Sequence, residues 1–133
     1  MPLFSRPDGV YLSKLPGFRK MFPFLMVTRT ESVIGHQQQM RMKNTLALLA
    51  KLNEGRTEQK YTPFHILLAA AVRIMALRPE NNRFVVGRRI YQRRDIVLSF
   101  VTKKELTEHA AEVNVKMVFE PTDTLPEVAQ KVW

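Results

Sequence analysis

The stretch YTPFHILLAAAVRIMALRP, residues 61–79, constrains the fold more than any other part of this sequence. Thr62 can cap the start of a helix, Pro63 suits its first position, and Pro79 follows directly after its end. Apolar residues surround most of this helix, so we expect it to be buried on most sides. A chain of 133 residues, of which 45% are hydrophobic, has the size of one domain and has enough apolar side chains to bury this helix.

Four strand-like segments follow the helix. RFVVG and RRIYQ predict two short strands with a turn around Gly87. DIVLSFV, residues 95–101, is apolar on both faces, which is typical of a strand covered on both sides. VNVKMVFEP alternates apolar and polar side chains, as a half-buried strand does. Asp123 or Thr124 can then cap a last helix, LPEVAQKVW.

The sequence before the helix predicts one strand and a second helix. SVIGHQQQMRMK, residues 32–43, has the length of a long strand, although neither of its faces is simply apolar. NTLALLAKLNEG, residues 44–55, predicts a helix with a stripe of leucines. Asn44 or Thr45 can cap that helix, and Gly55 can end it.

The first part of the chain is organised differently. Residues 1–31 contain four prolines and two glycines, which argue against a long helix. Their many aromatic and leucine side chains are too apolar for a free tail. We therefore expect an N-terminal arm, residues 1–31, that lies against a folded body or a neighbouring subunit, and a body formed by residues 32–133. The order of elements predicts an α+β fold with a mixed sheet and flanking helices.

Composition excludes several classes of site. The chain has no cysteine, so it can form neither disulfides nor thiolate metal sites, and it has no cysteine nucleophile. The N-terminus lacks the order of a signal peptide, and the longest apolar run, ILLAAAV, is too short to span a bilayer. We therefore expect a cytoplasmic protein without a membrane partner.

Arginine is concentrated in one stretch. Residues 78–96 contain six arginines, and they supply much of the net charge of +9. Three interpretations remain open: a solvated hairpin, a binding surface for a small phosphorylated ligand, and a nucleic-acid site. Nucleic acid is the least favoured, because only Phe84 and Tyr91 could stack on bases and no nucleic-acid-binding motif is present.

The three histidines carry no recognisable catalytic or metal pattern. His36, His65 and His109 each lack a second metal ligand at helical spacing, so we expect no metal. His65 lies on the apolar helix, where a hydrogen-bonded core histidine is the favoured interpretation. A structural role is also favoured for His36, and a surface role for His109. The sequence contains no phosphate-binding glycine loop and no nucleophile elbow.

Several segments share their order and spacing with a known enzyme family. The helix in ILLAAAVRIMALRPENNRFV ends in Pro79, Glu80 and Asn82, and the segments RRDIVLSFVT and VKMVFEPTDTLPEVAQKV follow it. HQQQMRMKNTLALLAKLNEG and DGVYLSKLPGFRKMFPFLMVTRTES precede it. This pattern resembles the catalytic domain of the 2-oxoacid dehydrogenase acyltransferases, the dihydrolipoamide acyltransferases, whose fold is shared with chloramphenicol acetyltransferase.

The resemblance implies an incomplete catalytic domain. The family's catalytic motif, H-x-x-x-D-G, supplies a histidine that acts as general base, and it is absent from these 133 residues. We therefore expect residues 32–133 to form the N-terminal half of a chloramphenicol-acetyltransferase-like domain that is inactive alone. No residue here is assigned a catalytic role, and whether the chain itself is an enzyme stays open.

The resemblance also suggests a ligand and partners. In the family, coenzyme A enters a channel between subunits of a trimer. Arg93 and Arg94 align closest to the coenzyme A wall, with Arg88 and Arg89 behind them, although solvated arginines beside the channel are an equal alternative. We expect acyl-CoA or CoA as substrate, no permanently bound cofactor, and a homo-oligomer or a complementing chain as partner. The alternative is a non-enzymatic basic module that binds nucleic acid or an acidic partner, or a scaffold paralogue.

Overall fold

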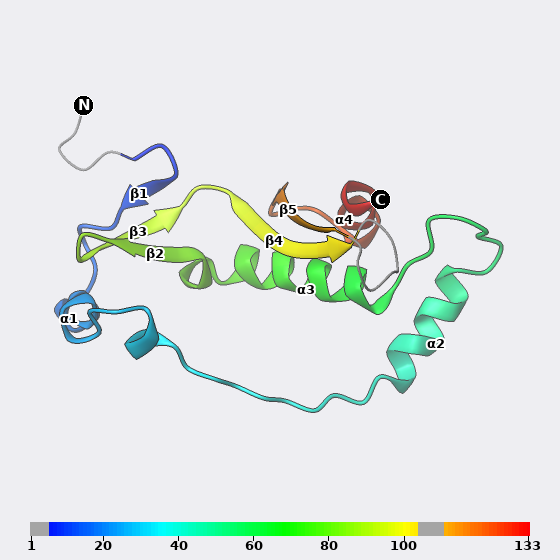
Figure 1. Cartoon of the computed structure of the whole chain (residues 1–133), viewed down its shortest axis with the longest axis horizontal. Coiled ribbons are helices and arrows are strands. Elements are labelled where there is room, and N and C mark those ends of the chain that lie inside the picture. The colour runs from blue at the N-terminus through cyan, green and yellow to red at the C-terminus, as the bar shows by residue number, and fades with distance from the viewer. Residues whose placement is uncertain (1–5, 104–110) are drawn as a thin grey trace.

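The computed structural model describes residues 6–103 and 111–133. The described residues form an α+β arrangement of four helices and two small antiparallel sheets, so the α+β class is confirmed, whereas the predicted mixed sheet is not formed among them. Helix α3 (Pro63–Leu77) runs along the middle of an elongated molecule. A three-stranded sheet and α1 (Gly17–Leu25) lie at one end, and α2 (Lys43–Leu52) lies at the other (Figure 1).

The three-stranded sheet joins the arm to the predicted hairpin. Its order is β1 (Gly9–Tyr11), β3 (Arg89–Arg93), β2 (Arg83–Val86), and all pairs are antiparallel. The hairpin prediction is confirmed, with Phe84 opposite Tyr91. Strand β1 comes from the arm and pairs with the edge of β3 that β2 leaves open, so this part of the arm lies against the body.

The second sheet consists of β4 (Ile96–Lys103) and β5 (Glu112–Phe119). Residues of one face, including Ile96 and Phe119, are buried in the main core. The opposite face is open among the described residues, where Val101 is 61% and Val118 is 55% exposed. The alternation predicted for β5 is therefore confirmed, and the prediction that the preceding strand is covered on both sides is wrong.

The main core lies where α3, the β4–β5 sheet and α4 (Leu125–Val132) meet. Val72, Phe119 and Val128 are each at most 1% exposed. Burial of such a side chain contributes roughly 1.5–3 kcal/mol. These contacts hold the long helix against the sheet.

Helix α3 is buried on one side only. Its ends match the prediction, since it starts at Pro63 and ends two residues before Pro79. Leu67, Ile74 and Leu77, however, are 53–62% exposed. The prediction that this helix is buried on most sides is therefore wrong for the described chain, because no described element covers this second apolar stripe.

A second, smaller cluster joins α2 to α3. The Asn53 side chain accepts a hydrogen bond from the Tyr61 backbone N–H at 2.8 Å and donates one to the Tyr61 carbonyl at 2.9 Å. Of the predicted leucine stripe on α2, Leu49 is buried against Tyr61, whereas Leu46 and Leu52 are exposed. The helix is thus confirmed, but the prediction of its cap is wrong: the N-cap position is Met42, without a side-chain hydrogen bond.

His65 is the hydrogen-bonded core histidine that the sequence indicated. Its side chain is 5% exposed, and its Nδ1 accepts a hydrogen bond from the Thr62 backbone N–H at 3.0 Å. The ring of Trp133 packs edge-on at 5.6 Å between centroids. Because a backbone N–H can only donate, Nδ1 must be unprotonated in this arrangement. Burial also lowers the pKa of His65 below its ordinary value. His109 lies outside the described residues.

The predicted strand at residues 32–43 is not formed. The chain passes through η1 (Thr30–Ser32) and then runs extended to α2 without pairing to any described strand. An extended segment becomes a strand only beside another edge, and no described edge lies along it. Among the described residues, every helix is too short or too polar to cross a bilayer.

We predict that stability falls as His65 takes up a proton. The lowered pKa means that the unfolded chain binds more protons than the folded chain below about pH 6.5. The contribution of His65 to stability is therefore complete above that pH and is lost as the pH falls. If the helix cap is lost with it, the free energy of unfolding should fall by about 1 kcal/mol. Urea unfolding followed by fluorescence of Trp133 at about pH 7.5 and about pH 5.5 measures the change.

The matched control is His65→Gln, which keeps an acceptor for the Thr62 N–H but cannot titrate. This variant should lose less stability between the two pH values than the wild type. Equal losses in both proteins would contradict the assignment.

Candidate functional site: an arginine-lined groove

The turn of the β2–β3 hairpin places an arginine in an unusual backbone conformation. The two turn residues, Gly87 and Arg88, have φ values of +54° and +62°. A two-residue hairpin turn with both φ values positive matches the twist of the strands and favours glycine or asparagine. Arg88 therefore holds a left-handed conformation at a cost of about 1 kcal/mol. Such strain is more common at functional positions than elsewhere.

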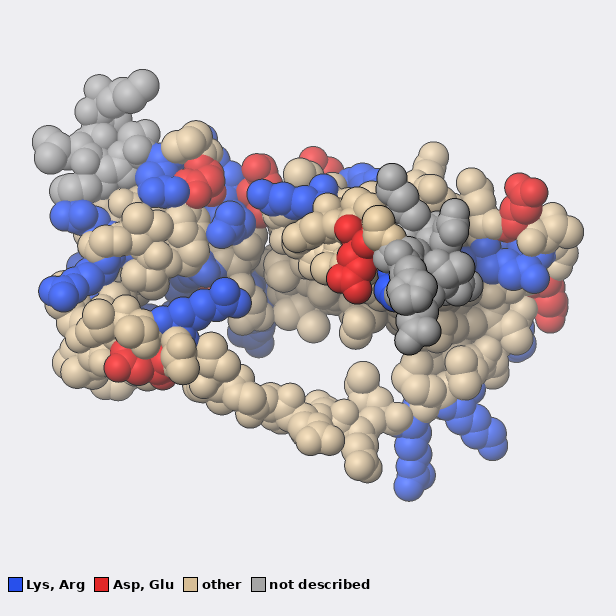
Figure 2. Space-filling view, in the orientation of Figure 1, with Lys and Arg blue, Asp and Glu red and all other residues tan. Residues whose placement is uncertain are grey.

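A groove of about 1230 Å³ lies between the hairpin and the segment formed by α1 and η1. Figure 2 shows Lys and Arg side chains gathered at this end of the molecule. Among the described residues that line the groove, none is acidic. Its cationic members are Arg19, Arg29, Arg83, Arg88 and Arg93. We call this feature the arginine groove.

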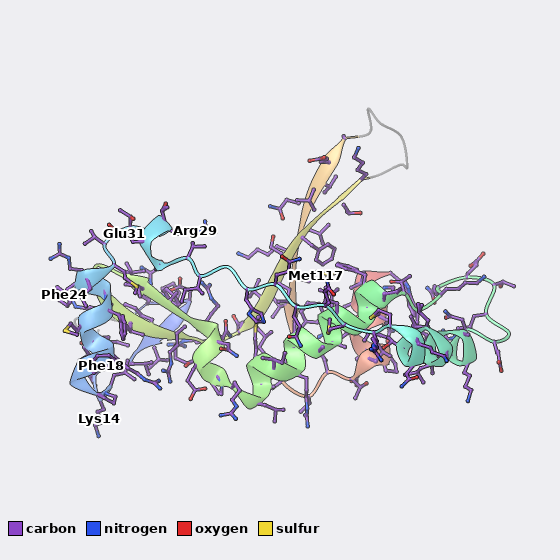
Figure 3. The ribbon with its side chains drawn as sticks, turned by 90° about the horizontal axis from the view of Figure 1, so that it is seen from below. Lys14, Phe18, Phe24, Arg29, Glu31 and Met117 are labelled. Atoms are coloured by element: carbon purple, nitrogen blue, oxygen red, sulfur yellow. The ribbon has the colours of Figure 1, made fainter. Side chains whose placement is uncertain are left out.

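Aromatic rings and an amide hold three of these arginines in place. The guanidinium of Arg93 lies 4.6 Å above the ring of Phe84, and that of Arg88 lies 5.4 Å from the ring of Phe24. Arg83 donates from Nε to Gln92 Oε1 at 3.1 Å. Figure 3 shows Phe18 and Phe24 on α1 and Arg29 immediately before η1 (Thr30–Ser32). Within the described chain none of the five groove arginines forms an ion pair, so their charge remains available to an anion.

Gly9 makes the position of Phe84 possible. A Cβ atom at Gly9 would lie 2.7 Å from Phe84 Cε1 and 2.9 Å from the Gln92 carbonyl oxygen. Any larger residue at this position would push the ring away from β1. Because Phe84 lies under Arg93, strand β1 of the arm helps to position a groove arginine.

The carboxylate of Asp8, close to Arg93, already forms an ion pair with Arg6. Its two oxygens accept from Nε and Nη2 of Arg6 at 2.8 and 2.9 Å. The hydrogen bonds from Arg6 keep the pKa of Asp8 below its ordinary value, and the charge of Arg93 acts in the same direction. Asp8 therefore stays ionised and paired with Arg6, which leaves Arg93 facing the groove.

The structure separates the four arginines that the resemblance suggested. Arg88 and Arg93 line the groove, whereas Arg89 and Arg94 do not. Arg89 and Arg94 are both exposed, and the Arg94 backbone N–H donates to the Asp8 carbonyl at 3.3 Å. Coenzyme A binding at these positions stays a prediction.

Three groove arginines were missed as site residues. Arg19 and Arg29 belong to the arm, and Arg83 belongs to β2. The only sequence signal was the concentration of basic residues in the arm and in residues 78–96. That signal does not show that these two segments meet in the fold. Neither His36, which is exposed, nor His65 lines the groove, and the described residues contain no cluster able to hold a metal ion.

We predict that Arg88→Asn makes the protein more stable and weakens its binding of inorganic pyrophosphate. Asparagine tolerates the left-handed conformation, so the free energy of unfolding should rise by about 0.5–1 kcal/mol. Loss of one guanidinium should lower affinity for the anion. Urea denaturation and calorimetric titration with pyrophosphate measure the two effects.

Arg89→Asn is the control, because Arg89 has ordinary strand geometry and does not line the groove. It should neither stabilise the protein nor weaken pyrophosphate binding to the same degree. If Arg88→Asn destabilised the protein, the assigned turn geometry would be wrong.

Comparison with protein-family models, with curated proteins and with solved structures found no match to this chain.

Proposed function

We propose that this chain is the coenzyme A-binding part of an acyltransferase of the dihydrolipoamide acyltransferase type. The observation that supports the proposal is the arginine groove, in which cations without carboxylate partners line a space of about 1230 Å³. The proposal joins this geometry to the sequence resemblance in residues 61–133 and in the arm.

Coenzyme A has the chemistry that such a groove would bind. Its 3′-phosphate and pyrophosphate are strong acceptors, and arginine binds phosphate oxygens through two parallel hydrogen bonds. The groove also has apolar walls, among them Phe22, Met26 and Ile90. These side chains suit the uncharged parts of the ligand, as in most cofactor sites.

Catalysis requires residues that these 133 do not supply. In the proposed reaction a histidine of an H-x-x-x-D-G motif removes a proton from the acceptor thiol or hydroxyl. The acceptor then attacks the thioester carbonyl, and coenzyme A leaves as the thiol. Of the described histidines, His65 is occupied by the helix cap and His36 lies outside the groove. A complementing polypeptide would provide the base and would complete a mixed, chloramphenicol-acetyltransferase-like sheet around β4 and β5.

We predict that CoA binding depends on Arg93 and much less on Arg94. Arg93→Gln removes a groove cation and should weaken binding about tenfold, as expected for a lost charge-assisted hydrogen bond. Arg94→Gln removes an equal charge at the adjacent position outside the groove, so it should change affinity less than about twofold. Isothermal titration calorimetry with CoA and with dephospho-CoA measures both variants.

Binding of CoA and dephospho-CoA with equal affinity would show that no arginine recognises the 3′-phosphate. Equal effects of the two substitutions would indicate attraction by net charge alone. Either outcome would contradict a formed coenzyme A site.

A second prediction concerns turnover. The isolated chain, mixed with acetyl-CoA and an acceptor thiol, should release CoA no faster than the buffer does. Robust turnover that survives replacement of His36, His65 and His109 would mean that the histidine mechanism does not apply to this protein.

The packing of Phe84 and Tyr91, the two aromatic residues of the segment 78–96, argues against the alternative of a nucleic-acid-binding module. Tyr91 is 4% exposed, and Phe84 stacks on Tyr91 with centroids 5.4 Å apart while Arg93 covers its ring. Neither ring is therefore free to stack on a base. If the alternative holds, binding of single-stranded nucleic acid should exceed that of CoA and should weaken steeply with salt.

A further inference from the structure

The turn at the start of the described chain places Arg6 beside strand β1. Arg6 and Gly9 form an antiparallel bridge across a two-residue turn. Gly9 in turn lies opposite Arg93 in the sheet. Residues that lie opposite one another on neighbouring strands direct their side chains to the same face of a sheet. Arg6, Gly9 and Arg93 therefore form one row across β1, with an arginine on each side of the glycine.

The ring of Phe84 fills the place that the missing side chain of Gly9 leaves in this row. A Cβ atom at Gly9 would lie 2.7 Å from Cε1 and 2.8 Å from Cζ of this ring. The guanidinium of Arg93 lies 4.6 Å from the ring centroid, and that of Arg6 lies 5.6 Å from it. Both cations thus contact one aromatic ring, and only the glycine of β1 stands between them in the row.

The carboxylate of Asp8 is influenced by both cations. Arg6 binds its two oxygens, from Nε at 2.8 Å and from Nη2 at 2.9 Å, and a pair with two parallel hydrogen bonds is stronger than a pair with one. These hydrogen bonds, and then the charge of Arg93, keep the pKa of Asp8 below its ordinary value. The backbone N–H of Arg94 also donates to the Asp8 carbonyl at 3.3 Å, which holds Asp8 beside the end of β3. Without Arg6, the carboxylate would therefore have Arg93 as an alternative partner.

We propose that Arg6 is a positioning residue for the arginine groove. Arg6 does not line the groove itself. It acts by holding Asp8, so that this carboxylate does not turn to Arg93 and cancel its charge. Arg93 then stays against the ring of Phe84, with its charge available to a ligand. The inference rests on the proposed function for its ligand, coenzyme A, while inorganic pyrophosphate offers the same kind of phosphate oxygen to the same arginine.

This role of Arg6 differs from attraction by net charge and from a role in folding. Net charge alone predicts that loss of Arg6 weakens anion binding only as much as loss of another cation outside the groove. A role in folding alone predicts that the loss persists when Asp8 is also replaced. The positioning role predicts a larger loss, because Asp8 then cancels the charge of Arg93, and it predicts recovery when the Asp8 carboxylate is removed as well.

Calorimetric titration with pyrophosphate at constant ionic strength tests the proposal. Arg6→Gln should weaken binding about fivefold, the effect of an ion pair at the upper end of those measured near protein surfaces. Arg94→Gln, which removes an equal charge outside the groove, should weaken binding less than about twofold. The double variant Arg6→Gln, Asp8→Asn should bind within about twofold of the wild type. Arg93→Gln should weaken binding about tenfold in the wild type and only about twofold further in Arg6→Gln, because the two residues act through one charge.

The fold should survive these substitutions, because the Arg6 side chain is 36% exposed, and circular dichroism checks each variant. Binding by Arg6→Gln as tight as that by Arg94→Gln, or a loss that persists in the double variant, would overturn the proposal. Titration with CoA separates this proposal from the proposed function. A wild type that binds pyrophosphate but not CoA would contradict the proposed function, whereas the pyrophosphate titrations would still decide the role of Arg6. A wild type that binds neither would overturn both.

Discussion

The packing of α3 against the β4–β5 sheet and α4 positions everything else in the molecule. Val72, Phe119 and Val128 meet there and exclude water almost completely. At the end of α3, η2 (Pro79–Asn82) leads directly into the hairpin. Two amide hydrogen bonds fix that junction: Gln92 Nε2 donates to the Pro79 carbonyl at 2.8 Å, and Asn82 Nδ2 donates to the Asp95 carbonyl at 3.0 Å. The hairpin that forms one wall of the arginine groove is therefore an extension of the core.

Two cations of the arginine groove, Arg88 and Arg93, lie against aromatic rings and not against carboxylates, so they keep their charge. A ring attracts a guanidinium through its quadrupole without cancelling the positive charge, as Phe84 does for Arg93. A carboxylate in the same place would satisfy the arginine and leave little attraction for a ligand. Asp8 is a carboxylate close to Arg93, but it forms an ion pair with Arg6. This arrangement leaves positive charge available to an anion.

Three exposed features of the molecule have one property in common. The second apolar stripe of α3, the open edges of the β4–β5 sheet and the extended residues 33–42 each lack a neighbour within the described chain. Each is costly or reactive when left in water, since apolar surface and unpaired edges promote association. The complementing polypeptide of the proposed function would cover the open edges of that sheet.

The sequence by itself determined the local elements, because their signals are local. Thr62 and Pro63 set the start of α3, Gly87 set the hairpin turn, and the alternation in β5 set its buried face. Tertiary structure alone decided which apolar faces are covered and which arginines converge. Arg93 and Arg94 are neighbours in sequence, yet only Arg93 lines the groove. It does so together with Arg19 and Arg29 from the distant arm. Residues 33–42 form no strand in the described chain, because a strand exists only where another edge lies beside it.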